Sequence, residues 1–164
     1  MTLRNDLGGP VGSVAVHTNP VVIKLAATVT DASKILTVSA SPSERLHIYG
    51  IVVKYTSTAT VGNRTVELEI RDDADAVLFC DYPGADINQA ASLVYYYQFF
   101  PGVTTDTAIV AGTVNFAHRA IPPTLLLPES FDIFVRDKAA VTANLDTVEI
   151  WCYCNREQVE RLTV

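Results

Sequence analysis

The stretch Asn63-Arg64-Thr65-Val66-Glu67-Leu68-Glu69-Ile70-Arg71 decides the fold class, because it alternates between apolar and polar side chains. Val66, Leu68 and Ile70 fall on one side of an extended chain, and Thr65, Glu67, Glu69 and Arg71 fall on the other. A period of two residues is that of a β-strand with one buried and one solvated face. We therefore predict a strand over 63–71 whose glutamates face water.

Strand-like segments continue on both sides of this stretch and are separated by short turns. They cover residues 21–29, 34–40, 45–55, 76–80, 93–100, 131–136 and 146–154, with shorter candidates at 108–110, 114–117 and 125–127. The segment 45–55 is apolar on both faces, which predicts a central strand covered on both sides. About eight to ten strands without a convincing helix predict an all-β fold, a jelly-roll-like antiparallel β-sandwich.

The chain divides into three parts around this sandwich. Residues 1–19 contain several glycines, Pro10 and few large apolar side chains, which predicts an extended N-terminal arm. Residues 20–155 form the β-sandwich, and residues 156–164 form a polar C-terminal tail. The arm is either a free terminus or a segment that orders on a neighbouring subunit.

Composition and charge exclude several classes of protein. Of the 164 residues, 49% are hydrophobic and 18% are charged, which excludes a disordered chain. The net charge of −6 disfavours direct binding to nucleic acid. Residues 67–106 hold eight acidic residues and one basic residue, a net charge of −7, which predicts one negative edge that faces solvent or a basic partner. We find no signal peptide and no membrane-spanning run, so we expect synthesis in the cytoplasm and no membrane partner.

The cysteines predict no metal, cofactor or disulfide framework. They are Cys80, Cys152 and Cys154, an odd number. The last two share one face of a predicted strand, where two thiols are poorly placed to bridge, so we expect buried, reduced thiols. No C-x-x-C pair is present, and the histidines have no zinc-ligand spacing with the cysteines.

No catalytic motif is present, so we expect no catalytic residue and no enzyme. Glu67 and Glu69 lie about 7 Å apart by strand geometry, a separation that fits an inverting glycosidase. The same strand supplies no flanking aromatic or polar groups, and we favour a solvated face. The acidic turn at 72–75 lacks the glycine and distal glutamate of an EF-hand, which favours an ordinary turn.

Aromatic residues mark the candidate interaction surfaces. Trp151 and Tyr153 point away from the apolar side of their strand, and the 93–100 strand carries rings on both faces, including Tyr96 and Phe100. Outward rings predict a surface for self-association. The pair His118-Arg119 lies in the long connection 103–121, where we expect contact with a partner.

Two blocks of sequence resemble small virion structural proteins of tailed bacteriophages. The first is Glu44-Arg45-Leu46-His47-Ile48-Tyr49-Gly50-Ile51, continued by Tyr55-Thr56-Ser57-Thr58-Ala59-Thr60-Val61-Gly62-Asn63-Arg64-Thr65-Val66. The second is Ile121-Pro122-Pro123-Thr124-Leu125-Leu126-Leu127-Pro128-Glu129-Ser130-Phe131, before a strand that ends in Arg136-Asp137. The resemblance covers roughly residues 44–154. It implies a capsid decoration (cement) protein that binds the outer capsid surface and stabilises the head by bridging capsomers.

The resemblance also implies partners and a location. The partners are the major capsid protein and further copies of the chain in a homotrimer, and the location is the outer surface of the virion. The subunit interface would then contain Trp151, Tyr153, Tyr96 and Phe100, and the capsid contacts would be Leu3, Arg4, Val11, Val14, His118 and Arg119. Two alternatives remain: another virion component, such as a head-fibre, neck or tail protein, and a carbohydrate-binding β-sandwich module.

Overall fold

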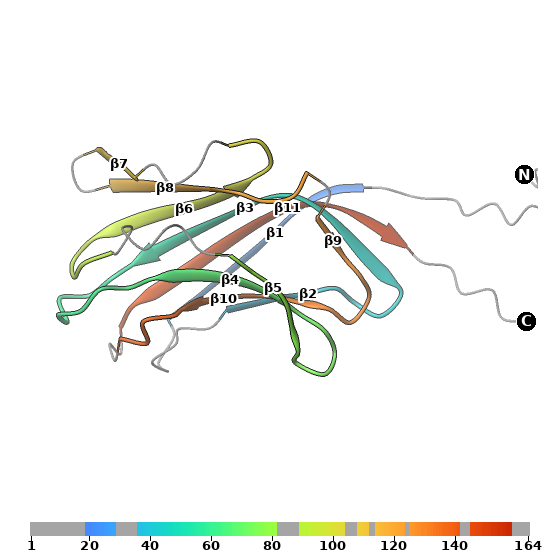
Figure 1. Cartoon of the computed structure of the whole chain (residues 1–164), viewed down its shortest axis with the longest axis horizontal. Helices are drawn as coiled ribbons and strands as arrows, with labels where there is room; N and C mark the ends of the chain where they lie inside the picture. Colours follow the sequence, from blue (N-terminus) through green and yellow to red (C-terminus); the bar gives the residue numbers. More distant parts are fainter. Residues whose placement is uncertain are drawn as a thin grey trace, which may run out of the picture.

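The structure is a computed structural model that describes residues 19–28, 36–81, 89–103, 108–111, 114–123, 125–141 and 145–158. These residues form eleven β-strands and no helix (Figure 1). The strands are β1 (Asn19–Thr28), β2 (Leu36–Ser39), β3 (Glu44–Thr56), β4 (Val66–Arg71), β5 (Val77–Asp81), β6 (Val94–Phe100), β7 (Ala108–Ala111), β8 (Val114–Ala120), β9 (Leu125–Leu127), β10 (Asp132–Asp137) and β11 (Thr147–Gln158). The predicted arm, apart from Asn19, lies outside the described residues. The last strand continues to Gln158, into the predicted tail.

The strands form two sheets that pack as a β-sandwich (Figure 1). The seven-stranded sheet has the order β1-β11-β3-β6-β8-β7 with β9 beside β3, and the four-stranded sheet has the order β2-β10-β4-β5. The antiparallel pairs β1–β11, β2–β10, β3–β6 and β4–β5 are nested inside one another along the chain, from the outermost pair β1–β11 to the consecutive strands β4 and β5, as in a long hairpin wound on itself. That winding is a jelly roll, and the predicted fold class is confirmed.

Three strands, β7, β8 and β9, add to the eight strands of the roll. β8 pairs with β6 in parallel, and β7 pairs with β8 in a hairpin at the edge of the sheet. The sequence predicts an antiparallel sandwich, and the pair β6–β8 departs from that prediction. A parallel pair needs a crossover connection of about a dozen residues, and residues 101–113 supply it.

β3 keeps its apolar side chains inward across a β-bulge. Its buried side chains are Leu46, Ile48, Ile51, Val53 and Tyr55, which do not follow one alternation. The register with β11 shifts between Tyr153 and Cys154, so that Tyr49 is an extra residue on β3 and the alternation restarts after it. Tyr49 is 41% exposed and Arg45 is exposed, so the prediction of a strand covered on both faces is wrong.

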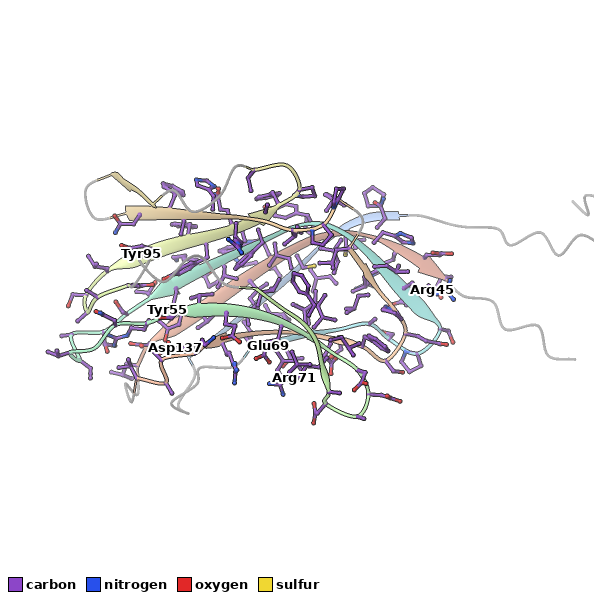
Figure 2. All side chains as sticks on the ribbon, in the orientation of Figure 1. Arg45, Tyr55, Glu69, Arg71, Tyr95 and Asp137 are labelled. Carbon is purple, nitrogen blue, oxygen red and sulfur yellow. The ribbon has the colours of Figure 1, made fainter. Side chains whose placement is uncertain are left out.

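The core lies between the inner faces of the two sheets (Figure 2). Val66, Leu68 and Ile70 of β4 point into it, as the alternation of this strand predicted. Cys152 and Cys154 are buried and unpaired, which confirms the prediction of buried, reduced thiols for these two residues. The side chain of Cys80 lies outside the described residues.

The opposite face of β4 is buried and ion-paired, although the sequence predicted that it faces water. Arg136 Nη2 lies 2.6 Å from Glu69 Oε1 and 3.4 Å from Glu67 Oε1. Lys138 Nζ lies 3.2 Å from Glu67 Oε2, and Arg71 Nη2 lies 2.6 Å from Glu69 Oε2. Each glutamate side chain is only 3% exposed. The prediction was wrong because β10 brings cations beside β4 from a distant part of the sequence.

A buried polar network closes one end of the sandwich, the end at which Figure 2 labels Tyr55. The carboxylate of Asp146 accepts hydrogen bonds from Arg64 Nε at 3.1 Å, the Tyr55 hydroxyl at 3.0 Å and the Thr58 amide at 2.8 Å. The guanidinium of Arg64 also donates to two backbone carbonyls in the 60–62 turn. Burial opposes ionisation of Asp146, but the hydrogen bonds from Arg64 and Thr58 hold its pKa below the usual value.

Candidate functional site

The outer face of the seven-stranded sheet carries five aromatic side chains and is the candidate interaction site. Trp151 and Tyr153 come from β11, Tyr96 and Phe100 from β6, and Phe116 from β8, and all five are half-buried. They alternate with buried residues, because successive side chains of a strand point to opposite faces. The four side chains predicted for the subunit interface thus lie on one face, which we name the ring face.

The strand register arranges the ring face in rows across the sheet. The first row is Val22, Tyr153, Gly50, Phe100 and Ala120. The ring of Phe100 lies over Gly50, where an added Cβ would be 2.2 Å from Phe100 Cε1. Phe100 and Tyr153 have ring centroids 6.2 Å apart. A glycine at position 50 therefore lets the two rings approach each other above β3.

The second row places a cation beside the tryptophan. It consists of Lys24, Trp151, Val52, Gln98 and His118. Lys24 Nζ lies 5.1 Å from the centroid of the Trp151 ring, within the range of a cation–π interaction. This row therefore combines an aromatic platform with polar groups.

The third row combines an ion pair with a stacked ring pair. Lys54 Nζ lies 2.6 Å from Glu149 Oε1, and the rings of Tyr96 and Phe116 stack at 5.4 Å with 24° between their planes. The hydrogen bond between Lys54 and Glu149 lowers the pKa of Glu149 and raises that of Lys54. These charges neutralise each other, so the row presents mainly aromatic surface.

The structure separates the other predicted contact residues. His118 and Arg119 are adjacent on β8, so their side chains point to opposite sides of the sheet, and only His118 belongs to the ring face. Leu3, Arg4, Val11 and Val14 lie outside the described residues.

Sequence reasoning missed Phe116 and Lys24. Alternation within 114–117 is too short to orient Phe116, because its face depends on the parallel pairing with β6. Lys24 joins the ring face only through the pairing of β1 with β11 across most of the chain.

The described residues contain no group of three or more His, Cys, Asp and Glu side chains that could hold a metal ion. In the same part of the chain, no helix is long and apolar enough to cross a membrane.

Comparisons with known proteins show likeness of fold only. No protein-family model matches the sequence, and no curated protein matches it. An arabinose-bound α-L-arabinofuranosidase has a similar structure at a TM-score of 0.37 and 14% identity, over 88% of this chain and 23% of the enzyme chain. A chain in the structure of infectious bursal disease virus, Gt strain, has a TM-score of 0.30 and 10% identity, over 98% of this chain and 37% of that chain. This protein thus spans well under half of the chains that it resembles, and the likeness is confined to the β-sandwich.

Proposed function

We propose that this protein is a virion structural protein, specifically a decoration protein of a tailed-bacteriophage capsid. It would bind the outer capsid surface and stabilise the head by bridging capsomers. The observation that carries the proposal is the ring face, an aromatic surface on a rigid sheet. The resemblance of the 44–66 and 121–131 blocks to phage virion proteins supports a tailed-bacteriophage head as the particle to which the protein binds.

The ring face has the composition of a protein interface. Trp and Tyr are enriched among the residues that dominate binding energy, and this face carries Trp151, Tyr153 and Tyr96. Half-buried rings are also held in place by their neighbours, so little side-chain freedom is lost on binding. We assign this face to contacts between copies of the chain in a trimer, and the N-terminal segment to the capsid.

The two blocks that carry the resemblance have structural roles that suit a rigid clamp. The turn at 61–64 supplies Arg64, which closes one end of the sandwich. The 121–131 block supplies β9, which pairs with β3 near the opposite end of that strand. A rigid body with several binding surfaces can bridge subunits through avidity without any single strong contact.

The test uses the purified chain and heads of the virus that encodes it. We expect the chain to sediment with heads that lack it, and cryo-electron microscopy to place it on the outer shell. Trp151→Ala combined with Tyr153→Ala should weaken self-association at least about ten-fold in sedimentation velocity, whereas the exposed turn variant Asp73→Ala should not. Absence of the chain from the outer shell would overturn the proposal, and a location in the neck or tail would favour the other virion roles.

A carbohydrate-binding module is the second candidate, because Trp151 and Tyr153 offer neighbouring rings on an open sheet. A glycan array decides between the two. Binding that is lost in Trp151→Ala supports this candidate, and an array without any bound glycan removes it.

A further inference from the structure

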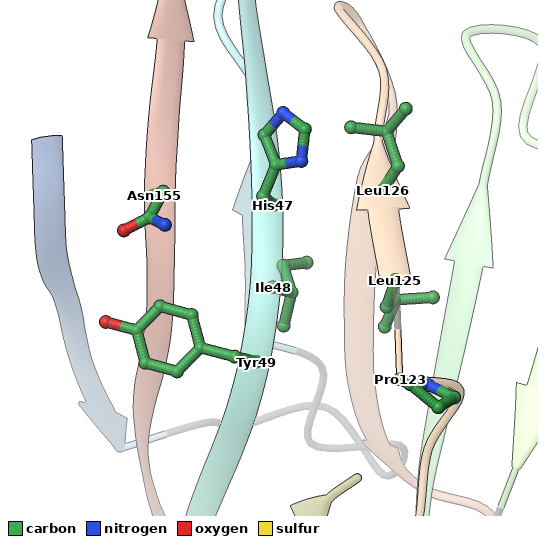
Figure 3. Close-up of a pocket in the computed structure, with 7 residues that line it drawn as sticks. All are labelled: His47, Ile48, Tyr49, Pro123, Leu125, Leu126 and Asn155. Atoms are coloured by element: carbon green, nitrogen blue, oxygen red, sulfur yellow. The ribbon is translucent and has the colours of Figure 1, made fainter. Parts of the chain in front are cut away.

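A shallow hollow opens on the same side of the sheet as the ring face (Figure 3). Its volume is about 190 Å³, and it lies where β3 runs between β11 and β9. The residues that line it are His47, Ile48, Tyr49, Pro123, Leu125, Leu126 and Asn155. Tyr49 and Leu126, which lie on opposite sides of His47, are 41% and 43% exposed, so the hollow has two large apolar side chains open to solvent.

The hollow results from a gap along one edge of β3. On that edge β9 pairs with residues 46–48 and β6 pairs with residues 51–56. Among the described strands, none pairs with Tyr49 and Gly50 on this edge, and the bulge turns Tyr49 outward. The gap is therefore built into the pairing of the strands and does not depend on one side-chain rotamer.

The chemistry of the hollow suits an apolar side chain. His47 Nε2 lies 2.6 Å from Glu157 Oε2, so the rim histidine already has a partner. The remaining surface comes mainly from Ile48, Leu125 and Leu126. A cavity of about 150 Å³ can hold a benzene ring, so this volume accommodates a branched aliphatic side chain.

The described part of the chain begins on β1, two strands away from β3 and on the side of the hollow that Asn155 lines. Asn19 pairs with Arg156 on β11, and Pro20 pairs with Asn155, which lines the hollow. Neighbouring strands are about 4.8 Å apart, so Asn19 lies roughly 10 Å from β3. Eighteen residues precede Asn19, and they include the apolar residues Leu3, Leu7, Val11, Val14 and Val16.

We propose that the side chain of Val14 occupies this hollow within the same copy of the chain. The five residues from Val14 to Asn19 can span about 17 Å, which exceeds the roughly 14 Å of three strand spacings from β1 to Leu126 on β9. A short tether gives an effective concentration in the millimolar range, which favours the segment of the same copy over that of a second copy. The inference concerns the free protein and does not depend on the virion role.

Disulfide trapping in the full chain tests the proposal. Val14→Cys and Leu126→Cys are combined in a Cys80→Ser background and exposed to a mild oxidant at low protein concentration. We expect an intrachain disulfide between these positions to form at least about ten-fold faster than in the control. The control combines Val14→Cys with Val77→Cys, because Val77 is 49% exposed on the other sheet.

Equal rates of disulfide formation in the two double-cysteine variants overturn the proposal. A disulfide between copies, detected with a mixture of isotope-labelled and unlabelled chains, also overturns it and identifies a second copy as the occupant. A second measurement avoids cysteine chemistry. Hydrogen exchange at residues 47–49 and 125–127 should accelerate in Val14→Asp and stay unchanged in Val14→Leu, and unchanged exchange in both variants contradicts the inference.

Discussion

Replacing Arg64 with methionine is the sharpest test of what holds the sandwich together. Arg64 is fully buried, and its guanidinium contacts Asp146 through Nε at 3.1 Å and Nη2 at 3.3 Å. It also donates to the carbonyl oxygens of Thr60 at 2.9 Å and Gly62 at 2.6 Å. Methionine keeps much of the apolar volume but removes every donor, so the variant isolates the loss of these four hydrogen bonds.

The expected loss follows from the charge left behind. In Arg64→Met the carboxylate of Asp146 stays buried and keeps only its bonds from Tyr55 and Thr58. Removing one partner of a buried ion pair costs about 3–5 kcal/mol, because the other charge remains uncompensated. Since domains are stable by about 5–15 kcal/mol, we expect the variant to lose about a fifth or more of its free energy of unfolding at pH 7.

The loss should also depend on pH. In the native protein the pKa of Asp146 is below its usual value of 3.8. The ionised carboxylate therefore adds to the free energy of unfolding above about pH 3.8, and this stabilisation disappears as the pH falls through the folded pKa. Without Arg64, burial raises the pKa of Asp146, and the folded variant takes up a proton that the unfolded chain does not. The difference between variant and native protein should therefore be larger at pH 8 than at pH 5.

Equilibrium unfolding in urea measures both effects. Trp151 is the single tryptophan and reports on β11, and linear extrapolation gives the free energy of unfolding. Arg45→Met is the control, since Arg45 is exposed on β3 and should change stability by less than about 0.5 kcal/mol. A loss below about 1 kcal/mol in Arg64→Met, or the same loss at both pH values, would refute the reasoning.

Two further variants test the ring face. Gly50→Ala places a Cβ 2.2 Å from Phe100 Cε1 and should lower the free energy of unfolding, measured by thermal unfolding, by about 1–3 kcal/mol. The loss should be smaller in a Phe100→Leu background, and equal losses in the two backgrounds would contradict the close approach. Because the hydrogen bond from Lys54 lowers the pKa of Glu149, the stability from this pair is present above about pH 4.5 and lost as the pH falls through the folded pKa. Calorimetry should therefore find Glu149→Gln less stable than the native protein at about pH 6, with a difference that shrinks as the pH falls through the folded pKa of Glu149, whereas a constant difference would contradict this.

The sequence predicts the strands better than their surroundings. The alternation of 63–71 correctly orients Val66, Leu68 and Ile70, because side-chain direction in a strand depends only on neighbouring residues. It fails for Glu67 and Glu69, because Arg136 of β10, about 70 residues further along the chain, pairs with both of them in addition to the local Arg71. Local polarity does not determine exposure when a distant strand supplies the counter-charge.

The ring face shows the same limit. Trp151 and Tyr153 are correctly oriented by the pattern within β11, whereas β6 carries rings on both faces and its pattern alone does not decide whether Tyr96 and Phe100 point outward. Their common face follows only from the order of the strands, which places β3 with Gly50 between them. The hollow is also beyond prediction, because it depends on a bulge and on how β6 and β9 divide one edge of β3.

The two outer faces of the sandwich differ in how their polar groups are paired and in how much aromatic surface they leave exposed. An open face of an antiparallel sheet is normally polar, and the four-stranded sheet follows this rule by pairing Glu67 and Glu69 with cations of its own chain. On the seven-stranded sheet, the polar pair Lys54–Glu149 is likewise satisfied within the chain, whereas the rings beside it remain half-exposed. Burial of those rings against a partner would remove apolar surface from water without breaking an ion pair. We therefore expect a partner to bind at the ring face at a lower cost than at the outer face of the four-stranded sheet, where it would have to desolvate existing salt bridges.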